Sequence, residues 1–434
     1  MNEWLPDYPG SFFLLRIIRF QNARMKKREP QANLIIHIDN PLPDGQNNRA
    51  AIKIPGNEAG QAIDNSNDQL EKVYIEVTNA CNLECRTCMR NVWNEPIGYM
   101  EENTFSQIMH GLMQLSSKPL LFFGGYGEPF AHPQILEMIE TAAKQGYQVE
   151  VISNGILLDP SVSAALIDLC VDRVWVSIDG STPERYADIR IGDELPKVIE
   201  NLTAFQNLRE STPSNRTKLG IAFVAMKRNI RDLPAVIQLG IRLGADQFSI
   251  SNVLAHTKEM QQEVLYQKSL YNQVNPSTKW FPAKQFPRMD TNPLTLPVIE
   301  NASISVNNLR VNKEKKPKGG SICPFIDGQS ISIRWDGKVS PCLPLLHSHE
   351  SYLDDIIRKS HAYSVGNINE NDLFEIWNDR EFSSLRDRLR IFDFSPCTLC
   401  NSCEMAEANL EDCFGNVHPA CGGCLWAQGF IQCP

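Results

Sequence analysis

Six short apolar segments alternate with helical patterns between residues 72 and 253, and this alternation restricts the fold more than any other feature. The apolar segments are rich in β-branched and aromatic residues, while the stretches between them place apolar residues three or four positions apart. Six strand–helix units predict an α/β fold, a parallel sheet curved into a partial barrel rather than a closed eightfold one. The functional site is then expected at the carboxyl ends of the strands. The predicted strands are 73–77, 120–123, 149–153, 174–179, 220–226 and 247–253.

The alternation also divides the 434 residues into regions. The predicted regions are a small N-terminal element of unknown role (1–70), the partial barrel (71–256), a polar, proline-rich connector or insertion (257–320) and a cysteine-rich domain (321–434). In the last region, an Asp336-Gly337 turn predicts a β-hairpin. An amphipathic pattern over 371–390 predicts a helix.

Charge and hydropathy narrow the possible partners. A net charge of −9 gives no reason to expect nucleic acid. No apolar run is long enough to span a bilayer, since the best candidate, "SFFLLRIIRF", is interrupted by Arg16 and Arg19. The N-terminus lacks the positive region of a secretory signal, so we expect a cytoplasmic protein. The apolar stretch is expected to pack on its own protein and not on a membrane, with an amphipathic helix that docks on a membrane or a partner as the alternative.

The chain contains 13 cysteines, an odd number that falls in clusters. Without a secretory signal, this usage favours thiolate-bound metal over a disulfide framework. Cys170 stands apart from the clusters at the end of a helical pattern and is predicted to fill the core.

One cluster, Cys81-x3-Cys85-x2-Cys88, follows directly on the first predicted strand and therefore lies at the expected site. A structural zinc ion needs four protein ligands, whereas a [4Fe–4S] cluster is held by cysteine thiolates, normally four. Three thiolates on such a cluster leave one iron open for a substrate or cofactor. The alternatives are a zinc site completed by a distant ligand, and a coincidence of spacing.

The sequence "CNLECRTC" after a strand, at the head of six strand–helix units, resembles the radical S-adenosylmethionine (radical SAM) enzymes. The resemblance implies that Cys81, Cys85 and Cys88 hold a [4Fe–4S] cluster whose open iron chelates the methionine group of SAM. It further implies reductive cleavage of SAM to a 5′-deoxyadenosyl radical, which abstracts hydrogen from a substrate. The residue before the third cysteine is often aromatic in that family and is Thr87 in this chain.

The resemblance also implies which residues contact SAM. The motif "GGYGEP" (124–129) follows the second strand, "SNG" the third and "SIDG" the fourth. Gly125, Gly127 and Glu128 are expected to contact the SAM ammonium. The ribose hydroxyls and the SAM carboxylate are expected near Ser153, Asn154, Ser177 and Asp179. Arg190 is expected to pair with the carboxylate and Asn252 to reach the adenine. The alternatives are an ordinary strand–helix loop for the glycine motif, a surface arginine for Arg190 and a strand-end cap for Asn252.

The C-terminal cysteines resemble the SPASM extension of radical SAM enzymes, which carries auxiliary [4Fe–4S] clusters. Cys323 followed by Gly337-x4-Cys342 matches its opening, and Cys397-x2-Cys400 matches its next step. The sequence then departs from the usual pattern, and zinc is the alternative metal because paired CxxC motifs also bind zinc. Two complete clusters need eight thiolates, so individual cysteines are not assigned among the nine candidates, Cys323, Cys342, Cys397, Cys400, Cys403, Cys413, Cys421, Cys424 and Cys433.

SPASM enzymes mostly mature other macromolecules, and the closing "HPACGGCLWAQGFIQCP" is similar to the cofactor-modifying maturases of tungsten-containing aldehyde oxidoreductases. The resemblance implies a protein or peptide substrate, such as a tungstopterin aldehyde oxidoreductase, and a reductant such as ferredoxin or flavodoxin. One alternative is a peptide-modifying enzyme that forms thioether or carbon–carbon crosslinks. The alternative from another class is a non-catalytic iron–sulfur electron carrier or scaffold.

Overall fold

The computed structural model describes residues 69–192, 194–271, 286–306, 321–354, 356–399 and 403–434. Residues 68–434 form one compact unit. The predicted N-terminal element lies almost wholly outside the described residues. Within the described part of the chain, no helix is long and apolar enough to cross a membrane.

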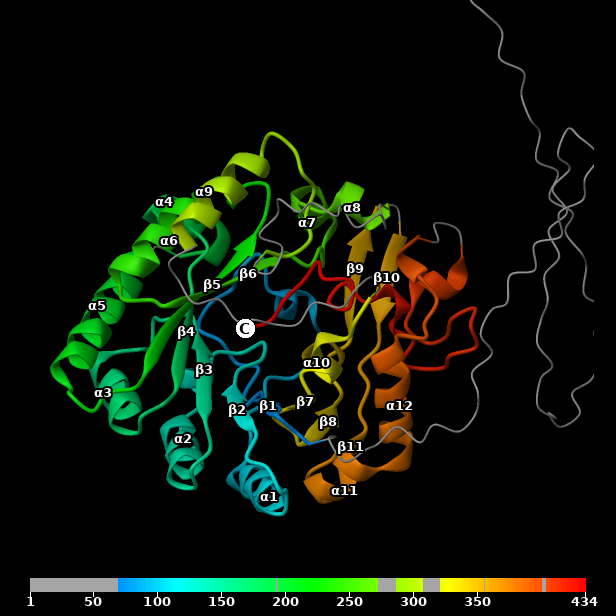
Figure 1. The fold of residues 1–434 in the computed structure, drawn as a ribbon, viewed down its shortest axis with the longest axis horizontal. Helices are drawn as coiled ribbons and strands as arrows, with labels where there is room; N and C mark the ends of the chain where they lie inside the picture. The colour runs from blue at the N-terminus through cyan, green and yellow to red at the C-terminus, as the bar shows by residue number, and fades with distance from the viewer. Residues whose placement is uncertain (1–68, 193, 272–285, 307–320, 355, 400–402) are drawn as a thin grey trace, which may run out of the picture. The chain divides into compact units, whose positions relative to one another are not determined.

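Six parallel strands form the centre of the molecule, in the order in which they occur in the sequence (Figure 1). They are β1 (Lys72–Ile75), β2 (Leu120–Phe123), β3 (Val149–Ser153), β4 (Arg173–Ser177), β5 (Lys218–Ala225) and β6 (Gln247–Asn252). Their parallel pairing confirms the six predicted strand–helix units. All carboxyl ends therefore meet at one edge of the sheet, where the first cysteine motif begins.

Helices cover the outer side of these strands (Figure 1). Local sequence determines several of their starts: Asp159 accepts hydrogen bonds from two backbone amides of α3, and Pro160 occupies its first turn. The barrel helices are α1 (Glu102–Met113), α2 (Ile135–Lys144), α3 (Pro160–Asp168), α4 (Pro183–Arg190), α5 (Leu195–Ser211) and α6 (Leu233–Arg242). In the predicted connector the structure has α7 (Lys258–Glu263), α8 (Gln267–Tyr271) and α9 (Leu296–Val306).

The C-terminal region continues the barrel sheet instead of standing apart from it. Strand β7 (Ser330–Ile333) pairs in parallel with β1, and β8 (Lys338–Ser340) and β11 (Gly366–Asn367) extend the sheet to nine strands. A separate antiparallel pair is formed by β9 (His349–Leu353) and β10 (Ile356–Ser360). Because β7 and β1 share backbone hydrogen bonds, the C-terminal region is held in a defined position beside the first strand of the barrel.

The predicted hairpin is confirmed, since β7 and β8 are antiparallel and Gly337 turns between them with a φ of 86°. The prediction of a single helix over 371–390 is wrong. The chain forms α11 (Leu373–Asn378) and α12 (Arg380–Ile391), because Asp379 has an extended backbone and caps the second helix. A further short helix, α10 (Pro324–Asp327), follows Cys323.

The prediction for Cys170 is also wrong. The residue is exposed and adopts a left-handed backbone with a φ of 54° where α3 has ended. The helical pattern continued to this residue, but the turn after the helix points its side chain away from the core.

Candidate active site

The loop of three cysteines is held at the carboxyl end of β1 by contacts to a later part of the same loop. Thr78 Oγ1 donates to the Gly98 carbonyl at 2.6 Å, and Asn79 Oδ1 accepts the Gly98 amide at 2.8 Å. The Asn79 amide nitrogen also donates to the Pro96 carbonyl at 3.0 Å. These bonds close residues 78–98 into a compact loop.

Each of two thiols in this loop faces a hydrogen-bond donor from elsewhere in the site. Cys81 Sγ accepts the Leu83 amide at 3.4 Å and lies 3.9 Å from Asn154 Nδ2. Cys85 Sγ lies 3.9 Å from Arg190 Nη1. Donors directed at sulfur stabilise the thiolate form, which is the form that binds metal.

Burial acts in the opposite direction on Cys81 and Cys88. It raises the pKa of Cys81, and it raises the pKa of Cys88 to about 11. Cys81, Cys85 and Cys88 interact electrostatically with one another, so the fold brings the three predicted ligands together. A cluster of three thiols, in which burial opposes the ionisation of Cys81 and Cys88, fits a site where a bound metal group supplies the compensating charge.

The glycine motif after β2 packs directly on the cysteine loop. A side chain at Gly127 would place its Cβ 2.2 Å from the Thr78 carbonyl, and one at Gly125 would meet the Glu76 side chain at 2.6 Å. The Glu128 amide donates to the Ala80 carbonyl at 2.7 Å. Glycine is therefore required here for close approach of two loops.

Glu128 joins the ends of β2 and β3. Its Oε1 accepts the Phe130 amide at 3.2 Å and its Oε2 accepts the Asn154 amide at 2.7 Å. The side chain is buried, and this burial raises the pKa of Glu128 to about 7. The Ser153 hydroxyl accepts the Gly155 amide at 2.9 Å. The structure thus places Glu128, Ser153 and Asn154 in one hydrogen-bonded group beside Cys81.

A second group joins the end of β4 to Cys85. Asp179 is fully buried, and its Oδ2 accepts Arg190 Nε at 2.8 Å, while its Oδ1 accepts the Val224 amide at 2.7 Å. Arg190 therefore forms an ion pair with Asp179, and its remaining guanidinium nitrogen faces the Cys85 sulfur. Ser177 is half-buried at the end of β4.

Asn252 ends β6 and contacts the C-terminal segment. Its amide nitrogen donates to the Arg288 and Phe430 carbonyls at 2.9 and 2.8 Å. Its Oδ1 is buried without a hydrogen-bond partner, which leaves one acceptor on this side chain. The residues predicted to contact SAM thus form three groups at the carboxyl edge of the sheet. The Glu128 group lies beside Cys81 and the Asp179–Arg190 pair beside Cys85, whereas Asn252 contacts the C-terminal segment.

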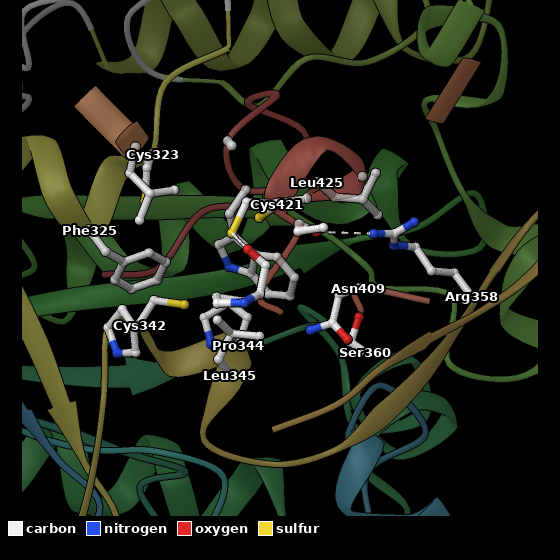
Figure 2. A pocket seen from close by; sticks show the side chains of 18 of the residues that line it. Cys323, Phe325, Cys342, Pro344, Leu345, Arg358, Ser360, Asn409, Cys421 and Leu425 are labelled. Carbon is white, nitrogen blue, oxygen red and sulfur yellow. Dashed lines mark hydrogen bonds between the residues drawn. The ribbon is translucent and has the colours of Figure 1, made fainter. Parts of the chain in front are cut away.

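A cavity in the C-terminal region is lined by four of the other cysteines, Cys323, Cys342, Cys421 and Cys424 (Figure 2). They come from distant parts of the sequence: the start of α10, the end of the β7–β8 hairpin and the C-terminal CxxC motif. Burial raises the pKa of each of these four thiols. Four thiols around one cavity match the number and type of donors that a [4Fe–4S] cluster needs.

The remaining C-terminal cysteines lie elsewhere. Ser395 Oγ lies 3.1 Å from Cys413 Sγ and 3.6 Å from Cys397 Sγ, so these two thiols share one neighbour. Cys403 is exposed, and Cys400 lies outside the described residues. Cys433 interacts with Cys424 but does not line the cavity. In the described ranges, no three histidine, cysteine or acidic side chains converge tightly enough to hold a single metal ion.

The sequence reasoning missed a buried charge network between the barrel and the C-terminal region. His347 Nε2 lies 2.8 Å from Glu76 Oε2, and His347 Nδ1 lies 2.7 Å from Glu95 Oε2. Arg334 adds a contact to Glu95 at 3.1 Å. Trp93 stacks on the imidazole, with ring centroids 4.1 Å apart.

This network joins three elements: Glu76 follows β1, Glu95 belongs to the cysteine loop, and His347 comes from the C-terminal region. Burial lowers the pKa of His347, but the hydrogen bond and charge of Glu76 outweigh it and raise the pKa above its usual value. Both ring nitrogens face carboxylates, as an imidazolium requires. The one signal in the sequence was Glu76, a charged residue in an apolar strand pattern.

Two family models match the chain. The radical SAM superfamily matches residues 75–219, and the SPASM iron–sulfur cluster-binding domain matches residues 323–404. The first range contains the loop of three thiols, and the second begins at the first cysteine of the cavity. This chain is a radical SAM enzyme with a SPASM domain. Its cofactors accordingly include a [4Fe–4S] cluster and SAM.

Curated relatives extend the match beyond the family models. The chain is 28% identical over 373 residues to the tungsten-containing aldehyde ferredoxin oxidoreductase cofactor-modifying protein of Pyrococcus furiosus, covering 84% of this chain and 97% of that protein. It is 23% identical over 389 residues to the Fe-coproporphyrin III synthase of Methanosarcina barkeri, covering 82% and 88%.

Solved structures support the fold. SuiB of Streptococcus suis bound to its precursor peptide SuiA matches with a TM-score of 0.53 and 14% identity, covering 77% of this chain and 70% of SuiB. The structure titled native anSMEcpe with bound AdoMet matches with a TM-score of 0.51 and 14% identity, covering 83% of this chain and 96% of that chain. At this identity the matches establish the shared architecture.

Proposed function

We propose that this radical SAM enzyme is a cofactor-modifying maturase of a tungsten-containing oxidoreductase. The observation that carries the proposal is the match to the Pyrococcus furiosus protein, which extends over 97% of that relative. The layout of the site supports it, because the loop of three thiols and the cavity lined by four cysteines lie in one compact unit. We place the enzyme in the reducing cytoplasm, with a ferredoxin- or flavodoxin-type reductant.

The residues of the barrel mouth have separable tasks in this proposal. Cys81, Cys85 and Cys88 hold the cluster that, with SAM bound, supplies one-electron cleavage and hydrogen abstraction. Glu128 accepts the backbone amide of Asn154, whose side-chain Nδ2 faces Cys81, and orients the loop that receives the SAM ammonium. Gly125, Gly127, Ser153, Ser177 and Asn252 form the remaining contact surface for SAM.

Arg190 and Asp179 act as a pair in the same proposal. Asp179 fixes the guanidinium of Arg190, which then presents one nitrogen to Cys85. The SAM carboxylate is expected beside this guanidinium. Because the guanidinium is buried, solvent screens its remaining nitrogen less than it screens an exposed arginine, although Asp179 offsets part of the charge.

We assign two auxiliary [4Fe–4S] clusters to the SPASM domain. The first is held by the four cysteines of the cavity described above. For the second we propose Cys397, Cys400, Cys403 and Cys413, with Cys397 and Cys413 meeting at Ser395. Cys433 is then the thiol in excess of eight.

The test begins with anaerobic reconstitution and an iron count. Three clusters predict about twelve irons per chain, and dithionite with SAM should yield 5′-deoxyadenosine. The reconstituted enzyme is then incubated with a tungsten-containing aldehyde oxidoreductase isolated from cells that lack the maturase. A gain of aldehyde-oxidising activity that requires SAM, and that the Cys85→Ala variant does not give, supports the proposal.

Two other results would change the assignment. No gain of activity, together with a SAM-dependent mass change in a short peptide encoded nearby, would support the peptide-crosslinking alternative. The shared fold with SuiB does not decide between these two. Zinc in place of iron in the C-terminal region would overturn the two auxiliary clusters.

A further inference from the structure

Arg358 is a buried cation that has no carboxylate partner among the residues described. It lies in β10, and only 4% of the residue is exposed. Its guanidinium donates to the carbonyls of Ala406 and Ala420, the latter at 3.4 Å. An ionised group removed from water is costly unless an opposite charge lies nearby. The surroundings of Arg358 should therefore contain a negative group.

The nearest candidates for that negative group are cysteines from both C-terminal sets. Arg358 lines the cavity with Cys323, Cys342, Cys421 and Cys424, and Figure 2 shows its guanidinium directed toward the Cys421 side of the cavity. The charged group interacts electrostatically with Cys421 and Cys424, and also with Cys397, which lies outside the cavity. One guanidinium therefore faces thiols of both proposed clusters.

The space that the Arg358 side chain occupies depends on a neighbouring glycine. A Cβ atom at Gly423, which lies between Cys421 and Cys424, would be 2.4 Å from Arg358 Cζ, so the glycine leaves the space that the guanidinium occupies. The neighbouring Lys359 differs sharply, because its side chain is 62% exposed and pairs loosely with Glu350 at 3.8 Å. Adjacent cations in one strand thus occupy opposite environments.

We propose that Arg358 is the shared counter-cation of the two auxiliary iron–sulfur sites and raises the reduction potential of both. The inference rests on the proposed function, since it needs clusters at these cysteines. A cluster held by four thiolates carries net negative charge, and one-electron reduction adds another. A nearby buried cation stabilises the reduced state more than the oxidised state, because the medium screens the charge poorly.

The test is a redox titration of the reconstituted full-length protein, followed by electron paramagnetic resonance of the auxiliary signals. Arg358→Met should lower the ratio of reduced to oxidised auxiliary cluster at a fixed potential by about tenfold, which corresponds to a shift of about 59 mV for one electron. Both auxiliary signals should shift, while the SAM-binding cluster should not. Lys359→Met removes the same charge from the next residue and should change the ratio less than about twofold, because solvent screens it.

Arg358→Lys keeps the charge and should keep the iron content and most of the potential. If Arg358→Met retains its iron and shifts no more than Lys359→Met, the inference is overturned. If both Arg358 variants lose iron, Arg358 is needed for assembly through its shape, which also overturns it. Iron missing from this region of the wild-type protein would instead overturn the proposed clusters, and the iron count distinguishes the two failures.

Discussion

The two cysteine-bearing regions of this protein are built in opposite ways. At the barrel mouth, the three thiols proposed as cluster ligands lie within one short loop. Cys85 is buried and Cys81 and Cys88 are half-buried, and donors that follow β3 and end α4 face Cys81 and Cys85. In the SPASM domain, the cavity cysteines come from distant segments. Cys323 and Cys342 are buried, Cys421 and Cys424 are half-buried, and most of the remaining wall is aromatic and aliphatic.

This difference in construction follows from what each site has to bind. A loop that leaves one coordination position free needs an open face and polar groups to receive SAM. A cluster that only stores or passes electrons needs complete thiolate ligation and protection from solvent. The β7–β1 pairing and the His347 network hold the two kinds of site in one body.

The largest expected effect separates the two regions outright. Cys85→Ala should lower 5′-deoxyadenosine formation by about a thousandfold or more, because SAM then lacks its metal partner. The SPASM domain should keep its iron, as measured by iron analysis and electron paramagnetic resonance. Cys170→Ala, at an exposed cysteine outside both regions, is the control and should behave as wild type. Undiminished cleavage in Cys85→Ala would place the SAM site elsewhere.

The second change removes a cysteine from the cavity of the SPASM domain. Cys342→Ala should remove about four irons per chain, since one cavity ligand is lost. SAM cleavage under dithionite should persist, because the barrel loop is intact, while maturation of the protein substrate should stop. Iron content is measured with 5′-deoxyadenosine yield in the same sample. Loss of SAM cleavage equal to that in Cys85→Ala would show that the regions do not function separately.

A third change tests the contact between the two regions. His347→Gln should lower the free energy of unfolding by about 3 to 5 kcal/mol, because Glu76 is left buried without a cation. The raised pKa of His347 means that its stabilising contribution is complete at and below its unfolded pKa of about 6.5 and is lost as pH rises through the higher folded value.

The thermal midpoints of the wild type and His347→Gln should therefore differ most near pH 6 and converge at alkaline pH. Arg380→Gln, which replaces a cation at the exposed start of α12, is a control that should give a small and pH-independent difference. A difference that grows with pH would show that His347 is neutral in the folded protein.

The smallest effect concerns one carboxylate at the barrel mouth. Glu128→Gln replaces one of two acceptor oxygens with a donor, so either the Phe130 or the Asn154 amide loses its partner. A cost of about 1 to 3 kcal/mol predicts SAM binding weaker by about 5- to 150-fold. Equilibrium binding of SAM and the iron content are the measurements. Unchanged affinity with full iron would show that SAM binding does not depend on this carboxylate.

Much of the barrel could be predicted because its information is local. The six strands were predicted from apolar runs, and the ligand loop from three cysteines within eight positions. The helix break at Asp379 was missed, since the amphipathic pattern continues across it. The pairing of Arg190 with Asp179 was missed as well, because the ends of β4 and α4 meet only after the crossover folds.

The sequence by itself determined the reaction class, through a cysteine spacing that one loop can satisfy without help from the rest of the chain. It also determined the parallel order of the strands, since periodicity is a property of short segments. Only the tertiary structure decided which C-terminal thiols share a cavity, and that Arg358 and His347 are buried among ionisable groups. Those arrangements depend on segments far apart in sequence, whose contacts exist only once the sheet has joined β7 to β1.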